Sequence, residues 1–122
     1  MFKQMFANCL LVKDFDKSLA FYQNILGLEL NTREGNFANF KIDNIELAIM
    51  QRDQATEMLP VRYMNSGGCV LLCFQVSDVE KTCSDLQTKG IKFISGPKVT
   101  SWGQTVAYFL DPDNNIWEIS KK

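Results

Sequence analysis

Two glutamates stand inside apolar, strand-like segments, where an acidic side chain is unusual. Glu46 lies in IELAIM, and Glu118 lies in IWEIS, directly after the turn cluster DPDNN at 111–115. Such a carboxylate can bind a metal ion, hold a cationic group of a ligand, or simply be solvated or paired with Lys or Arg. The rest of the chain decides among these three possibilities.

The chain contains no histidine, and this absence excludes much chemistry. Most zinc, iron and nickel sites use imidazole, as does most acid–base catalysis near neutral pH. Ser-His-Asp and Cys-His arrangements are therefore excluded. The four cysteines form no C-x-x-C pair, a scatter typical of reduced thiols in the cytoplasm: Cys9, Cys69, Cys73 and Cys83.

Length and charge narrow the class of protein further. A chain of 122 residues is long enough for one domain with its own core. The formal net charge of −1 gives no electrostatic case for a nucleic-acid partner. No signal peptide is expected, and no apolar run approaches the roughly 18 residues that a membrane span requires. We expect a cytoplasmic protein that does not enter a membrane.

The chain repeats its own pattern. CLLVKDFDKSLAFYQNILGLEL begins at Cys9, and CFQVSDVEKTCSDLQTKGIKF begins at Cys73. Each half reads as a strand, an aspartate, a helix, a glycine and another strand. Two copies of a βαβββ unit are therefore predicted, each too small to bury its sheet alone.

Signals for helix ends support this division. Asp14 is expected to cap the first helix, which Gly27 ends. In the second half, Ser77 and Glu80 have the spacing of a capping box, and Gly90 ends the helix. The apolar faces of the two helices are predicted to be Leu19, Phe21, Tyr22, Ile25 and Leu26, and Val79, Cys83 and Leu86.

Strand and linker signals complete the domain organisation. A single domain over 1–122 is expected, with a first module at about 1–50, a linker at about 51–68 and a second module at about 69–122. Turns are predicted at 34–36, 43–44, 96–97 and 111–115, between strands at 26–30, 36–42, 45–50, 92–95, 104–110 and 116–120.

These motifs together resemble the vicinal oxygen chelate superfamily of glyoxalases, bleomycin-resistance proteins and dioxygenases. The paired βαβββ units and DPDNNIWEI carry the resemblance, and Trp102-Gly103 makes the metal-free bleomycin-resistance branch the most similar. Asn114 replaces the usual glycine of DPDGN, and Asn tolerates the positive φ of such a turn. The resemblance implies an α+β fold, with two tandem βαβββ modules forming a cup-shaped mixed sheet and helices on its outer face.

The resemblance also implies where a metal would bind. Metal-using members take one ligand from the first strand and one from the last strand of each half. Here the first-strand positions fall on Ala7 and Leu71, which cannot bind a metal, and the last-strand positions fall on Glu46 and Glu118. Two carboxylates are a poor site for zinc or iron. No metal and no other cofactor is therefore expected.

Strand alternation predicts what lines the cup. If Ala7 and Leu71 face inward, so do Cys9, Leu11, Cys73 and Gln75, while their neighbours face the helices. Cup-facing Glu118 likewise places Trp117 and Ile119 on the helix side. Cys9 and Cys73 are interpreted mainly as small core hydrophobes. The candidate ligand-binding residues are Cys9, Glu46, Leu71, Cys73, Trp102 and Glu118.

The leading functional prediction is a metal-free binding protein of bleomycin-resistance type, which sequesters an aromatic or cationic small molecule. Two carboxylates in an apolar cup would favour a cation, and Trp102 could stack on an aromatic ring. One alternative is a glyoxalase- or dioxygenase-type enzyme with a non-standard metal site, which Gln75 or Cys73 could complete. Another is a regulatory module whose cup is filled by its own side chains. Family resemblance implies a homodimer, whether the modules pair within a chain or across subunits.

Overall fold

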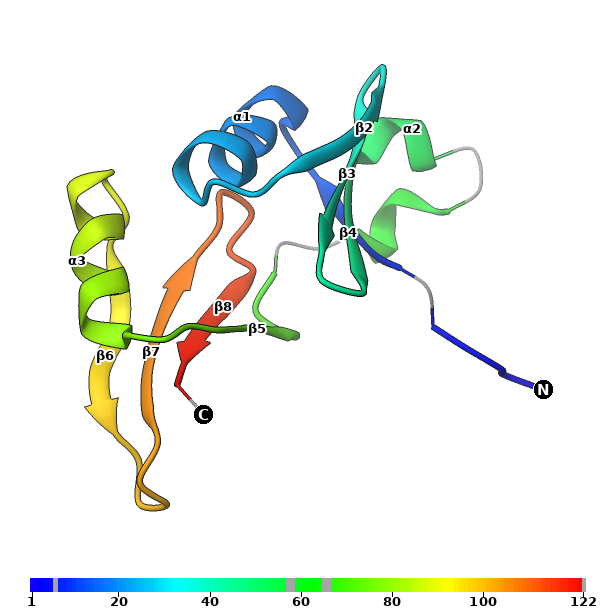
Figure 1. Ribbon diagram of the computed structural model, residues 1–122. Coiled ribbons are helices and arrows are strands. Elements are labelled where there is room, and N and C mark those ends of the chain that lie inside the picture. Colours follow the sequence, from blue (N-terminus) through cyan, green and yellow to red (C-terminus); the bar gives the residue numbers. More distant parts are fainter. Residues whose placement is uncertain (6, 57–58, 65–66, 122) are drawn as a thin grey trace. The chain divides into compact units, whose positions relative to one another are not determined.

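The computed structural model describes residues 1–5, 7–56, 59–64 and 67–121. The chain divides into two compact units, residues 1–65 and 66–122. Each unit contains one mixed four-stranded sheet (Figure 1). The predicted α+β class with two βαβββ modules is confirmed.

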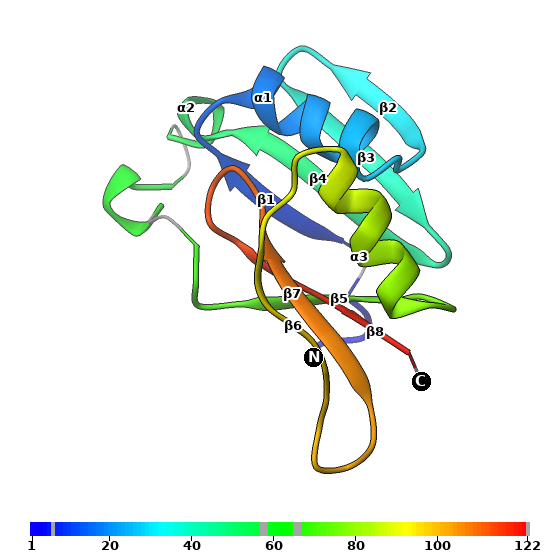
Figure 2. The ribbon, with the colours of Figure 1, turned by 90° about the vertical axis from the view of Figure 1, so that its left-hand side faces the viewer.

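The first module follows the predicted order of elements. Strand β1 pairs in parallel with β4, and the strand order is β1-β4-β3-β2. Its helix lies alongside the sheet and packs on β4 (Figure 2). The elements are β1 (Asn8–Val12), α1 (Phe15–Ala20), the π-helix η1 (Phe21–Ile25), β2 (Leu30–Glu34), β3 (Phe37–Ile42) and β4 (Ile45–Gln51).

The second module repeats this topology with the strand order β5-β8-β7-β6. Strands β5 and β8 are parallel, and α3 packs on β6 and β7 (Figure 1). The elements are β5 (Leu71–Gln75), α3 (Val79–Thr88), β6 (Phe93–Val99), β7 (Thr105–Leu110) and β8 (Ile116–Ser120). The segment expected to be a linker carries two short helices, α2 (Arg52–Ala55) and the 3₁₀ helix η2 (Val61–Tyr63).

The side of each helix that faces its sheet supplies most of the core. In the first module Phe15, Tyr22 and Phe40 are fully buried, and the predicted helix face is buried at Leu19 and Phe21 and half-buried at Ile25 and Leu26. In the second module the predicted face is buried throughout, at Val79, Cys83 and Leu86. Trp117 and Ile119 are buried, as predicted from alternation.

Aspartates cap both main helices. The Asp14 carboxylate accepts a hydrogen bond of 3.1 Å from the Lys17 backbone N–H, as predicted. In the second module the cap is Asp78, which accepts a bond of 3.0 Å from the Lys81 backbone N–H. The predicted Ser77 cap is therefore wrong by one residue, because Asp78 has the extended backbone of a cap and its carboxylate accepts from the N–H three residues further on.

Removing either cap should destabilise the protein by a similar amount. Asp14→Ala and Asp78→Ala each leave a first-turn N–H without its partner, and each should lower the free energy of unfolding by about 1 kcal/mol. The matched variants Asp14→Asn and Asp78→Asn keep a capping oxygen and should stay close to the parent protein. Urea unfolding measures all four, and equal losses for Ala and Asn would contradict the capping role.

Two strand predictions need correction. Residues 26–28 complete the helix instead of beginning a strand: Leu28 N–H donates to the Tyr22 carbonyl at 3.0 Å, and β2 begins at Leu30. The turn expected at 96–97 lies inside β6, where the pairing with β7 shifts register. Gly and Pro are common at such irregularities because they weaken regular strand pairing.

The turn predictions at 34–36, 43–44 and 111–115 fit the observed hairpins. Asp43 and Asn114 both have positive φ, 55° and 64°. Asp111 organises the longer turn: one carboxylate oxygen accepts from the Asp113 and Asn115 backbone N–H groups at 2.9 and 2.8 Å. Its other oxygen accepts from the Asn115 side chain at 2.8 Å. The DPDNN cluster therefore fixes the entry of the chain into β8.

Across the described ranges, no helix combines the length and apolar character that a membrane crossing requires.

Candidate functional site

Glu118 lies in the middle of β8, on the sheet face opposite the buried residues Trp117 and Ile119. Its strand partners are Cys73 on β5 and Tyr108 on β7. These three side chains therefore form one row across the sheet, because directly paired residues point to the same face. We call it the central row, Cys73–Glu118–Tyr108.

A hydrogen bond joins Tyr108 and Glu118 within the central row. The Tyr108 hydroxyl donates to the Glu118 carboxylate, and this bond is the main cause of a raised pKa at Tyr108, followed by burial. The pKa of the Cys73 thiol is also raised, first by burial and then by the negative charge of Glu118. Both neighbours are thus protonated at neutral pH, and the row carries one negative charge, on Glu118.

The thiol of Cys73 should become more reactive when that charge is removed. Glu118→Gln eliminates the charge that disfavours the thiolate, while the larger cause, burial, remains. We expect alkylation of Cys73 by iodoacetamide at pH 8 to be about two- to threefold faster in the variant. A Cys69→Ser background with mass-spectrometric site mapping isolates Cys73, and Cys9 is the internal control. An unchanged rate would contradict the coupling.

Two further rows flank the central row on the same face. On one side Ile116 pairs with Leu71 and Leu110, which gives an apolar row. On the other side Ser120 pairs with Gln75 and Val106. The face therefore changes from an apolar row at one end, through a single carboxylate, to a mixed row at the other, where Gln75 is exposed and Ser120 and Val106 are buried.

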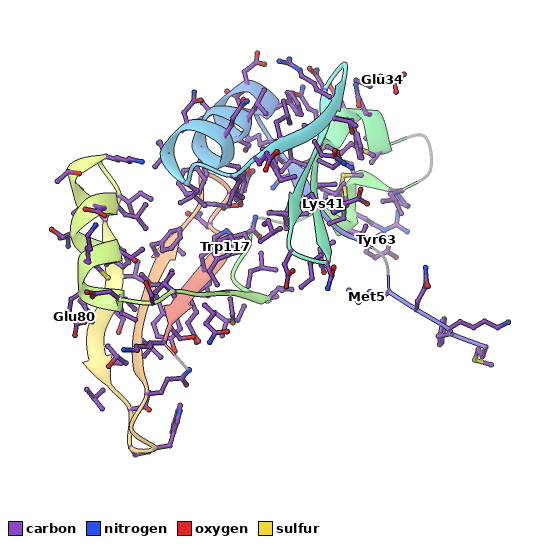
Figure 3. The ribbon with its side chains drawn as sticks, viewed as in Figure 1. Met5, Glu34, Lys41, Tyr63, Glu80 and Trp117 are labelled. Atoms are coloured by element: carbon purple, nitrogen blue, oxygen red, sulfur yellow. The ribbon has the colours of Figure 1, made fainter. Side chains whose placement is uncertain are left out.

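Glu46 lies in a different environment on the first sheet. The Asn39 side-chain amide donates to its carboxylate at 2.6 Å, and the Asn39 oxygen accepts from the Thr32 hydroxyl and backbone N–H at 2.5 and 2.9 Å. Lys41 is the strand partner of Glu46 (Figure 3 labels Lys41). Glu46 therefore already accepts a hydrogen bond from a local donor, and its strand partner is a lysine.

The two glutamates do not occupy equivalent places in the repeat. Leu47 pairs with the buried Phe40 on β3, and Trp117 pairs with the buried Phe109 on β7. Glu118, one residue further, therefore matches Ala48, while Glu46 matches Ile116. Consistently, Cys9 pairs with Ala48, as Cys73 pairs with Glu118. The equivalence expected from the motifs IEL and WEI is wrong, since it aligned the acids and not the strands.

The remaining candidate residues are dispersed over the two modules. Cys9 and Cys73 are exposed, so their interpretation as core residues is wrong, although burial of the thiol raises the pKa of Cys9. Leu71 is 48% exposed at the end of β5. Trp102 is 74% exposed in the β6–β7 hairpin, where its indole N–H donates to the Gln104 side chain at 3.0 Å.

Within the second module the central row joins Cys73 and Glu118, and Leu71 lies one row away. Tyr108 and Asn39 are additional polar residues that sequence reasoning missed. Alternation along QTVAYFL would have indicated Tyr108, because it shares a face with Glu118 once Ala107 and Phe109 are assigned to the core. Asn39 could have been found in the same way, between Ala38 and Phe40.

The side chains around Glu46 and Glu118 do not suit a zinc or iron centre. In the described ranges no group of three or more His, Cys, Asp or Glu side chains could hold a metal ion. Beside Glu118 stand a phenol and a protonated thiol, and beside Glu46 stand an amide and a lysine. Zinc and iron sites need three or four strong donors.

Comparisons with known proteins place the chain in a family. Residues 5–119 match the profile of the Glyoxalase/Bleomycin resistance protein/Dioxygenase superfamily. The chain is 37% identical over 119 residues to the uncharacterized protein YraH of Bacillus subtilis (strain 168), which covers 92% of this chain and 93% of YraH. It is 29% identical to Glyoxalase I of Saccharomyces cerevisiae over 86% of its own length but only 40% of that protein's. A crystal structure of a glyoxalase/bleomycin resistance protein/dioxygenase from Nocardioides covers 99% of this chain and 84% of its own, with 26% identity and a TM-score of 0.86.

Proposed function

We propose, since the chain belongs to the Glyoxalase/Bleomycin resistance protein/Dioxygenase superfamily, that it is a metal-free binding protein for a small organic molecule. Members of this superfamily bind small molecules. The observation that carries the proposal is Glu118, a half-buried carboxylate beside the apolar row of Leu71, Ile116 and Leu110. Its neighbours on the two adjacent strands are Tyr108, whose hydroxyl donates a hydrogen bond to it, and the thiol of Cys73.

The chemistry of Glu118 favours a cationic or hydrogen-bond-donating ligand. A carboxylate offers about four acceptor positions, and Tyr108 uses one of them. In the part of the chain that the structure describes, no ion pair compensates its charge. A ligand cation at this point would therefore gain a charge-assisted hydrogen bond without displacing a protein partner.

The candidate residues divide by role in this proposal. Glu118 supplies the charge, Cys73 and Leu71 supply neighbouring contact surface, and Trp102 supplies an exposed aromatic ring in the same module. Cys9 and Glu46 remain proposed contacts from the first module, with Glu46 the weaker one because Asn39 already donates to it at 2.6 Å. A homodimer in the cytoplasm is part of the proposal.

Binding without chemistry is the test of this function. Chelator-treated protein is titrated with metal-free bleomycin in a calorimeter, and the bound molecule is then recovered and weighed by mass spectrometry. We expect saturable, stoichiometric binding and a recovered molecule of unchanged mass. A modified product, or binding that depends on added metal, would refute a sequestering role.

A glyoxalase- or dioxygenase-type enzyme is the second candidate. Similarity to a Glyoxalase I favours it, although the chain spans less than half of that relative. Such an enzyme would need a metal held by Glu46, Glu118 and a further donor such as Gln75 or Cys73. Because the pKa of the Cys73 thiol is raised, a metal bound there would have to displace the thiol proton. Turnover of a 2-oxoaldehyde–glutathione adduct, abolished by chelation, would establish this alternative.

A further inference from the structure

The three rows on the second sheet specify the shape of a ligand as well as its charge. Successive residues on one face of a strand are about 6.5–7 Å apart, so neighbouring rows are separated by this distance. A ligand nitrogen at Glu118 therefore lies one row from the apolar side chains of Leu71, Ile116 and Leu110.

The opposite side of the central row cannot accept a second cation well. There Ser120 pairs with Gln75 and Val106, and Val106 pairs in turn with Lys98 on β6. Lys98 therefore stands at the β6 end of that row, and its positive charge disfavours a second cationic group on this side of Glu118. The apolar part of a bound cation is directed toward Leu71 instead.

Tyr108 also restricts the type of cation. Its hydroxyl occupies one acceptor position of the Glu118 carboxylate. A guanidinium binds carboxylates best as a two-pronged fork that uses both oxygens, and it would compete with that hydroxyl. An ammonium is a compact charge that needs only one free oxygen.

We propose that the ligand of this face is a monocationic amine whose apolar group lies one row, about 6.5–7 Å, from its nitrogen. This inference rests on the proposed binding function and adds the class of ligand. Arylalkylamines represent the class: a spacer of about three carbons places the nitrogen over Glu118 when the ring covers Leu71 and Ile116.

A homologous series tests the spacing. Benzylamine, 2-phenylethylamine, 3-phenylpropylamine and 4-phenylbutylamine are titrated by calorimetry, beside the neutral alcohols of the same lengths. We expect affinity to peak at the three-carbon amine, which should bind at least tenfold more tightly than its alcohol. A steady rise through four carbons in both series would reflect hydrophobicity alone and would overturn the inference.

Two variants test whether Glu118 and Leu71 bind the amine. Glu118→Gln should reduce the preference for 3-phenylpropylamine over its alcohol to less than about twofold. Leu71→Ser should weaken both compounds by about three- to fivefold and keep the preference for the amine. Retention of the full preference in Glu118→Gln would refute the assignment.

Bleomycin separates failure of this inference from failure of the proposed function. If metal-free bleomycin binds and Glu118→Gln weakens it, but no amine binds, the class of ligand is wrong and the binding function stands. If neither bleomycin nor any amine binds to the parent protein, both are overturned.

Discussion

Gly96→Ala is expected to lower the free energy of unfolding by about 3 kcal/mol or more. Gly96 lies at the irregular part of β6 with φ +80°, a region that side chains other than glycine rarely adopt. A methyl group there would lie 2.5 Å from the Val106 carbonyl oxygen and 2.9 Å from the Ala107 Cα. Both neighbours are backbone atoms of β7, so relief requires the strand to move.

Gly90→Ala is the matched control for this prediction. Gly90 has φ +94° at the end of α3, but nothing lies within 4 Å of the added methyl group. It therefore incurs only the backbone cost, about 1–2 kcal/mol. Urea denaturation of both variants measures the difference, and equal destabilisation would show that contact with β7 contributes nothing.

Glu118→Gln is expected to weaken binding of metal-free bleomycin by about ten- to a hundredfold, while Glu46→Gln changes it by less than about threefold. The reason is local pairing: Glu46 already accepts from Asn39 at 2.6 Å and lies opposite Lys41, whereas Glu118 accepts only from Tyr108 among the described residues. Hydrogen bonds to charged groups contribute about 1.5–3 kcal/mol, which corresponds to this range.

Calorimetry on the two variants shows which glutamate contacts the ligand. Glutamine keeps the size of glutamate, so circular dichroism should be unchanged in both. Equal losses in the two variants would indicate that both acids contact the ligand, and a loss only in Glu46→Gln would contradict the assignment of the site to the second module.

Local signals in the sequence predicted much of this fold. The helix cap at Asp14, the ends at Gly27 and Gly90 and the burial of Trp117 and Ile119 depend on neighbouring residues or on strand alternation. These patterns extend over only a few residues, so they can be recognised directly in the sequence. The repeat itself also followed from such patterns.

Strand register was not predictable in the same way. The five residues between Leu110 and Ile116 replace a two-residue turn in the first module, and hydrogen bonds to Asp111 decide how the chain leaves that turn. Aligning Glu46 with Glu118 by motif therefore gave the wrong equivalence. The pairing of Tyr108 with Glu118 depends on the same register, although alternation alone would have placed Tyr108 on that face of the sheet.

Native mass spectrometry of protein purified from cells without added metal distinguishes a metal-free binding protein from a metal-dependent enzyme. We expect a metal-free homodimer, and any co-purified mass should belong to a small organic molecule that Glu118→Gln no longer retains. A stoichiometric metal that survives dilution would contradict it. The enzyme alternative would then take its place, with Glu46 and Glu118 as the first ligands to replace.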